Sequence, residues 1–178
     1  MRGVRMSNTS KKKWLIIVLM VLLVIILTSV IIYLALFLQK GRSIEEVDLA
    51  PRQITTQIIE DMDLSDLTEV QQDQLIKHYN MPDGVIEDFS IYMSKSANKS
   101  FELACFKLQE RKDYDQLQQV IAEHITTKAQ GFKELSPTEY DQIQSYRLMQ
   151  KGRYVLMVIG DNASAIEQEF ISIFSEES

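Results

Sequence analysis

The longest apolar pattern in the sequence is a run of 25 residues, 14–38, that contains no charged side chain. An α-helix rises about 1.5 Å per residue, so this run would be roughly 37 Å long and could cross a hydrocarbon core of about 30 Å with some tilt. A cleaved signal peptide has a shorter apolar region followed by small residues, a pattern that differs from this one. The run contains no ionisable residue, so it has no side chain that could take part in ion or proton transport. It therefore predicts one uncleaved transmembrane anchor in contact with the lipid bilayer.

The charges on the two sides of this run are unequal. Five basic residues and no acidic residue precede it, and acidic residues follow it from Glu45 onward. An excess of positive charge on a short flank places that flank in the cytoplasm. The sequence thus predicts a single-pass protein of the cell membrane with a cytoplasmic N-terminus and an extracytoplasmic C-terminal domain. The expected parts are a basic cytoplasmic stub at 1–13, the transmembrane helix at 14–38, a juxtamembrane linker at 39–50 and the extracytoplasmic domain at 51–178.

Two helices are expected at the start of the outer domain. Pro51 suits a first helical turn, and apolar side chains recur at helical spacing over 51–62. The segment 68–71, Thr-Glu-Val-Gln, has the form of a capping box and predicts a second helix that begins there. The turn residues of 80–84, Asn-Met-Pro-Asp-Gly, would end it.

From Val85 the apolar period changes to two, which predicts a strand through about residue 93. A polar connection leads to a second strand over 101–108, and the two strands would form a hairpin. In the second strand, alternation places Ala104, Phe106 and Leu108 on one face and Leu103 and Cys105 on the other.

The last third of the domain predicts a long helix that Asp113 caps and that breaks near Gly131, a strand over about 143–149 and a nearly all-apolar strand over 154–159. Such a continuous apolar strand is typical of one covered on both faces. The segment 150–153 would join these strands in a tight hairpin, and a final helix would begin at about Asp161. The expected fold is an α+β domain of order ααββαββα, with an antiparallel sheet of about four strands packed by helices.

The net charge and the cysteine content of the chain indicate which partners and which cellular compartment suit the protein. All 25 acidic residues follow residue 39, whereas 5 of the 19 basic residues precede it, which gives the outer part a net charge of −11. Such an acidic domain is unsuited to nucleic acid. The single cysteine, Cys105, excludes an intramolecular disulfide and favours a bacterial envelope over a eukaryotic secretory pathway.

Catalytic chemistry has little support in the sequence. His78, His124 and Cys105 have no partners at ligand or catalytic spacing, and we interpret them as structural residues. The acidic clusters lack the calcium-loop pattern, and phosphate-loop and nucleophile-elbow motifs are missing from the sequence. We therefore predict no catalytic, metal-binding or cofactor-binding residues, and a protein that is not an enzyme.

Four residues in or beside the strands are candidates for a ligand pocket: Glu102, Lys107, Arg153 and Tyr154. Charged and aromatic side chains that converge in a hollow can fix a small ligand. The alternative is that these charges simply occupy an exposed face of the sheet.

The order of elements, together with the runs 102–108 (Glu-Leu-Ala-Cys-Phe-Lys-Leu) and 151–156 (Lys-Gly-Arg-Tyr-Val-Leu), resembles an uncharacterised domain family found in Gram-positive lipoproteins and single-pass envelope proteins. The resemblance spans about residues 48–174. It implies an extracytoplasmic location and carries no activity or functional residues. This chain differs from lipoprotein members because no cysteine near residue 40 could accept a lipid.

These observations predict a non-enzymatic interaction or adaptor module of the bacterial cell envelope, which would present its sheet or first two helices to another envelope protein. The alternative is a domain that binds a small ligand or a cell-wall fragment in a pocket near Lys107 and Tyr154. A hydrolase is a third hypothesis, but it has no constellation of residues to support it.

Overall fold

The computed structural model describes residues 14, 17–18, 20–30 and 48–175 of the chain. The chain divides after Ser43 into two units, of which the second extends from Ile44 to Ser178. In the first unit, residues 20–30 are helical. Within the part of the chain that the structure describes, no helix combines the length and apolar character needed to cross a membrane. The predicted stub at 1–13, much of the predicted anchor at 14–38 and linker residues 39–47 lie outside the described residues.

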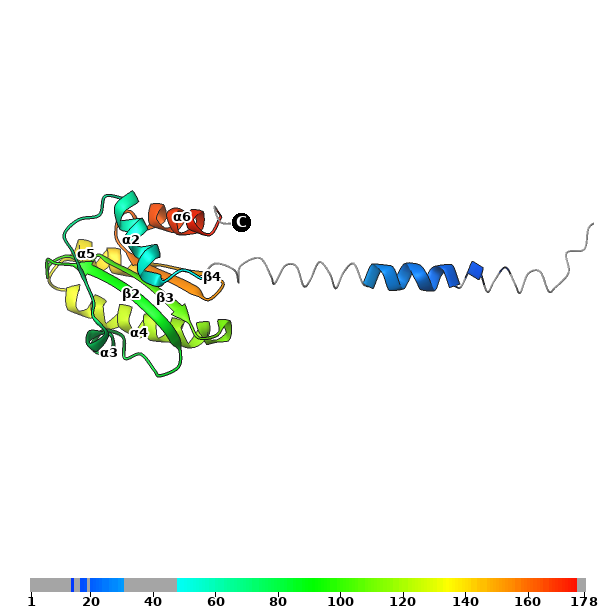
Figure 1. Ribbon diagram of the computed structural model, residues 1–178. Helices are drawn as coiled ribbons and strands as arrows, with labels where there is room; N and C mark the ends of the chain where they lie inside the picture. The colour runs from blue at the N-terminus through cyan, green and yellow to red at the C-terminus, as the bar shows by residue number, and fades with distance from the viewer. Residues whose placement is uncertain (1–13, 15–16, 19, 31–47, 176–178) are drawn as a thin grey trace, which may run out of the picture. The chain divides into compact units, whose positions relative to one another are not determined.

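The second unit contains a five-stranded antiparallel sheet with the order β1-β2-β3-β5-β4 (Figure 1). Its strands, in chain order, are β1 (Leu67–Glu69), β2 (Ile86–Ser94), β3 (Glu102–Leu108), β4 (Arg147–Lys151) and β5 (Tyr154–Ile159). The α+β class and the antiparallel sheet predicted from the sequence are confirmed. Both predicted hairpins are present, as β2–β3 and β4–β5.

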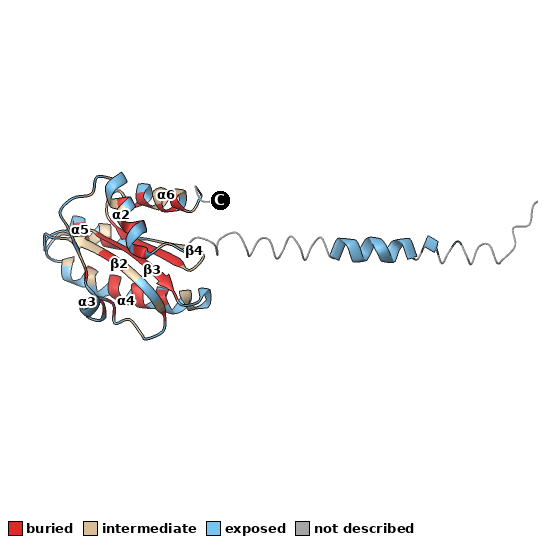
Figure 2. Ribbon diagram, in the orientation of Figure 1, coloured by how far each residue is buried: buried red, intermediate tan, exposed pale blue. Residues whose placement is uncertain are grey.

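The two central strands, β3 and β5, are buried along their whole length (Figure 2). Because side chains alternate across a sheet, these strands supply residues to two separate cores. Ala104, Phe106 and Leu108 belong to one core, and Leu103 and Cys105 belong to the other. The predicted division of this strand into two apolar faces is thus confirmed.

Helices cover both faces of the sheet (Figure 1). The Leu103 face packs against α2 (Pro51–Asp61) and α6 (Ala163–Ile173), which bury residues such as Ile58 and Phe170. The Ala104 face packs against α3 (Gln72–Tyr79), α4 (Tyr114–Phe132) and α5 (Pro137–Gln144). The short 3₁₀ helix η1 (Arg111–Asp113) leads into α4. The helices predicted at 51–62, from Asp113 to near Gly131, and from 161 correspond to α2, α4 and α6.

One predicted helix start is wrong, because residues 67–69 form the edge strand β1 and α3 begins only at Gln72. The Val70 N–H donates to the Ile91 carbonyl oxygen at 2.9 Å, which continues the pairing of β1 with β2. Edge-strand backbone groups need partners, and this tertiary pairing outweighs the local capping pattern. The sheet accordingly has five strands rather than about four.

A second predicted element is also wrong, because residue 143 lies in a helix instead of beginning a strand. The Ser136 side chain accepts a hydrogen bond from the Glu139 N–H, and Pro137 occupies the first turn, so α5 begins there. Ile143 is fully buried from this helix, and β4 starts only at Arg147.

Candidate functional site

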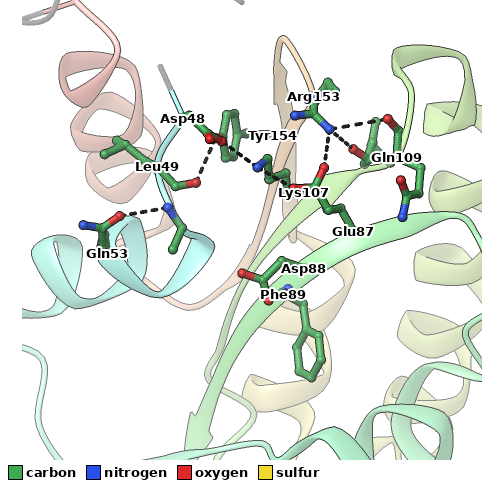
Figure 3. A network of polar contacts seen from close by, with 12 residues as sticks. Asp48, Leu49, Gln53, Glu87, Asp88, Phe89, Lys107, Gln109, Arg153 and Tyr154 are labelled. Atoms are coloured by element: carbon green, nitrogen blue, oxygen red, sulfur yellow. Dashed lines mark hydrogen bonds and ion pairs between the residues drawn. The ribbon is translucent and has the colours of Figure 1, made fainter. Parts of the chain in front are cut away.

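Three of the four predicted pocket residues lie together at one end of β3, but they hold a structural ion-pair network (Figure 3). Lys107 Nζ lies 2.7 Å from Asp48 Oδ1 and 2.7 Å from Glu87 Oε1. Arg153 donates to Glu87 Oε2 and, at 3.1 Å, to the Leu108 carbonyl oxygen. The Tyr154 hydroxyl donates to the Leu49 carbonyl oxygen at 2.8 Å.

This network attaches the segment that leads into the domain. Burial alone would lower the pKa of Lys107, but hydrogen bonds to Asp48 and Glu87 outweigh it and raise the pKa. Bonds from Lys107 and then Arg153 lower the pKa of Glu87. Each charge therefore has a counter-charge. Lys107 holds Asp48 against the sheet, and the Tyr154 hydroxyl holds Leu49 there.

Glu102, the fourth predicted residue, is at the opposite end of β3 and on its other face. Its side chain is fully buried. Glu102 Oε1 accepts a hydrogen bond from the Tyr79 hydroxyl, and Oε2 accepts from His124 Nε2 at 2.9 Å and Lys128 Nζ at 2.6 Å. We call Glu102, Tyr79, His124 and Lys128 the Glu102 cluster. The sequence-predicted pocket is thus divided between two sites.

Three elements bring the Glu102 cluster together. Glu102 is the first residue of β3, and Tyr79 is the last residue of α3. His124 and Lys128 lie one turn apart on α4 and therefore share a face of that helix. The Tyr79 and His124 rings stack with centroids 4.1 Å apart and an interplanar angle of 19°.

Electrostatics keep Glu102 ionised. Burial raises the pKa of this carboxyl, but the hydrogen bond from His124 and the charge of Lys128 outweigh burial and lower it to about 2. Burial and the adjacent Glu102 raise the pKa of Tyr79, so its hydroxyl stays a donor. His124 Nδ1 lies 2.8 Å from the His78 carbonyl oxygen. The imidazole ring of His124 is thus held between this carbonyl oxygen and Glu102 Oε2.

A cavity of about 320 Å³ adjoins this cluster, and His124 and Lys128 form part of its wall. We call it the basic pocket, because its ionisable side chains among the described residues are Lys77, His78, Lys99, His124 and Lys128. Its remaining walls are apolar or carry hydroxyl groups: Met93, Ser94, Ser96, Ala97, Phe101, Thr127 and Phe132. Glu102 sits behind the wall and is fully buried. The arrangement is suited to a ligand with an anionic group and an apolar part.

Sequence reasoning interpreted His78 and His124 as structural residues and did not foresee this pocket. Two features of the sequence could have indicated this site. His124 and Lys128 lie one helical turn apart, and Glu102 is a single carboxylate at the start of an apolar strand. Among the described residues, no three His, Cys, Asp or Glu side chains are grouped to hold a metal ion. Cys105 is a fully buried core residue, as predicted, and burial raises the pKa of its thiol.

The fold and site define a small α+β domain with a five-stranded antiparallel sheet and a buried, charge-paired carboxylate beside a basic pocket. Residues 60–160 match the family model of a domain of unknown function, DUF4358. This match covers more than half of the chain, so the protein belongs to the DUF4358 family, in agreement with the resemblance to an uncharacterised domain family. No curated protein matches the chain. No solved structure matches it either.

Proposed function

We propose that this protein is a non-enzymatic binding protein that holds a small organic anion in the basic pocket. The observation that carries the proposal is that Lys77 and Lys128, together with two histidines, line one hollow of a domain whose net charge is strongly negative. A third lysine of the lining, Lys99, pairs with Glu139. Cations gathered in a concave, partly apolar wall raise the local concentration of an anion.

The basic pocket offers several hydrogen-bond donors that differ in charge. Lys128 uses one of its three N–H donors on Glu102, which leaves donors for a ligand. Lys77 is exposed in the last turn of α3 and contributes a full positive charge. Burial lowers the pKa of His78, so that ring contributes mainly as a neutral hydrogen-bonding group near pH 7. Phe101, Phe132 and Met93 would contact the apolar part of the ligand.

The state of Glu102 supports binding over catalysis. A general base works best when its pKa is near the operating pH, and the pKa of Glu102 is about 2. Both of its oxygens also accept hydrogen bonds from the protein. We therefore assign Glu102 the role of holding His124 and Lys128 in place.

We further propose that residues 14–38 anchor this domain outside the membrane of a Gram-positive bacterium. The uncharged run of 25 residues and the basic segment before it support this proposal. An adaptor role has less support than ligand binding. In the described part of the domain, the large exposed apolar side chains are Ile76, Leu135 and Ile171, which belong to different segments. Single apolar residues of this kind are ordinary on protein surfaces.

Titration calorimetry on the full-length protein in a non-ionic detergent tests the binding proposal. The probes are benzoate and phenyl phosphate, with benzamide as a neutral control. We expect saturable binding of at least one anion and a loss of about tenfold in affinity in Lys77→Gln, equivalent to about 1.4 kcal/mol. Lys112→Gln removes the same charge from η1, at the far end of β3, and should leave binding unchanged. Binding of benzamide as tight as benzoate, or no Lys77-dependent binding, would overturn the proposal.

A further inference from the structure

A second cavity, of about 430 Å³, adjoins the basic pocket. The two hollows share three lining residues, Ser94, Lys99 and Phe101, so they meet at the β2–β3 hairpin. The loop after α2, the first residue of β1, helix α5 and the loop between β5 and α6 also line the second cavity. We call it the acceptor pocket, after the chemistry of its lining.

Carboxylates and amide oxygens distinguish the acceptor pocket from its neighbour. Glu139 and Asp161 line it together with Gln142 and Asn162. Asp161 is exposed, and its Oδ1 accepts a hydrogen bond from Gln142 Nε2. Acceptors of this kind suit the hydrogen-bond donors of a ligand.

The one lysine of this pocket has its charge offset. Lys99 Nζ lies 3.0 Å from Glu139 Oε1, and Glu139 Oε2 accepts from the Ser100 N–H at 2.8 Å. Burial raises the pKa of Glu139, but the bonds from Ser100 and Lys99 outweigh burial and lower it, so Glu139 stays ionised. The charges of Lys99 and Glu139 therefore offset each other. The carboxylate of Asp161 then gives the acceptor pocket its negative charge.

Resting on the proposed function, we propose that the two pockets form one elongated site for a zwitterion. The anionic group of the ligand occupies the basic pocket, and its ammonium group occupies the acceptor pocket near Asp161. Phe101, which lines both pockets, contacts the middle of the ligand. One pocket is positively charged and the other is negatively charged, and they share part of their lining. This arrangement matches a molecule with opposite charges at its two ends. Short peptides carry a carboxylate and an ammonium group in this arrangement, and amino-sugar phosphates carry a phosphate and an ammonium group.

The test measures what the ammonium group adds to binding. Calorimetry on the full-length protein in detergent compares dialanine, trialanine, tetraalanine and glucosamine 6-phosphate with their N-acetyl forms, which keep the anion and lose the positive charge. We expect the best free zwitterion to bind at least tenfold more tightly than its N-acetyl form. The peptide and sugar-phosphate arms distinguish a carboxylate ligand from a phosphate ligand.

Two test variants, Asp161→Asn and Ser65→Lys, and one control variant, Asp83→Asn, locate the contribution of the ammonium group. Asp161→Asn should remove most of the preference for the free ammonium form, while Asp83→Asn, in the exposed turn between α3 and β2, should preserve it. Ser65→Lys places a competing ammonium group in the acceptor pocket and should weaken the free form alone. Equal binding of free and N-acetyl forms, with Lys77 dependence retained, would overturn the elongated site and leave anion binding intact. If neither benzoate, phenyl phosphate nor any zwitterion bound in a Lys77-dependent way, both proposals would fail.

Discussion

Glu102 and Lys107 lie at opposite ends and on opposite faces of β3, and each is almost completely buried among counter-charges from other segments. Lys107 holds the segment that leads into the domain, at Asp48, whereas Glu102 supports the wall of the basic pocket. Both candidate pockets are therefore separated from the point where the chain enters the domain by the length of this strand. Neither Asp48 nor Leu49 lines either pocket.

Removing the charge of Glu102 should destabilise the domain strongly. Glu102→Gln leaves Lys128 without its buried counter-charge and weakens the hydrogen bond with His124, and breaking a buried ion pair typically costs about 3 kcal/mol or more. Urea denaturation measured by circular dichroism gives the free energy of unfolding. Glu110→Gln, which breaks a surface ion pair with Lys112, is the matched control and should have little effect. Equal midpoints for the two variants would contradict a stabilising role for the cluster.

The stability that Glu102 provides should depend on pH in a defined direction. Its pKa is about 2 in the folded protein against an ordinary value of 4.5, so the unfolded state binds the proton more readily. The contribution is thus fully present above about pH 4.5 and is lost as the pH falls toward 2. Denaturation midpoints of the wild type and Glu102→Gln should converge as the pH is lowered through this window. A constant difference between pH 7 and 3 would contradict the assignment.

Gly160 lies against the ring of Phe101, which lines both pockets. A Cβ atom at Gly160 would lie 2.8 Å from Phe101 Cδ2, closer than such atoms pack, so the ring must move in Gly160→Ala. We expect a loss of about 1–3 kcal/mol in stability and weaker binding of the zwitterions.

Gly131→Ala is the control for this glycine. A Cβ atom there meets nothing within 4 Å, and the residue lies in α4, where alanine is the better helix former. This variant should be stabilised by up to about 1 kcal/mol. Thermal unfolding of both variants gives the comparison, and a Gly160→Ala protein as stable as the wild type, with unchanged binding, would refute the steric argument.

Loss of the Lys107 charge should release the segment at residues 48–50. Lys107→Gln breaks the ion pairs with Asp48 and Glu87, although the Tyr154 bond to Leu49 remains. Limited proteolysis of the full-length protein should then show faster cleavage near this segment. The rate in Lys112→Gln should match the wild type, because Lys112 pairs only with neighbouring surface charge. Unchanged cleavage in Lys107→Gln would assign the attachment to Tyr154 and packing alone.

Local physical chemistry decided much of the fold. Patterns among neighbouring residues predicted several elements. These patterns are the apolar runs of β3 and β5, the helical spacing of apolar residues in α4, and the turn residues between β4 and β5. The start of α5 also has a local signal, since Ser136 and Pro137 form a helix-opening pair.

The sequence by itself determined the α+β class, the two-sided burial of the central strands and the division of the chain into a long apolar run and an acidic domain. Tertiary structure decided the edge strand β1, because three residues become a strand only when β2 supplies their hydrogen-bond partners. It also decided the candidate site. Glu102 is separated from Tyr79, His124 and Lys128 by more than 20 residues along the chain. Only the packing of α3 and α4 on β3 brings these side chains within hydrogen-bonding distance.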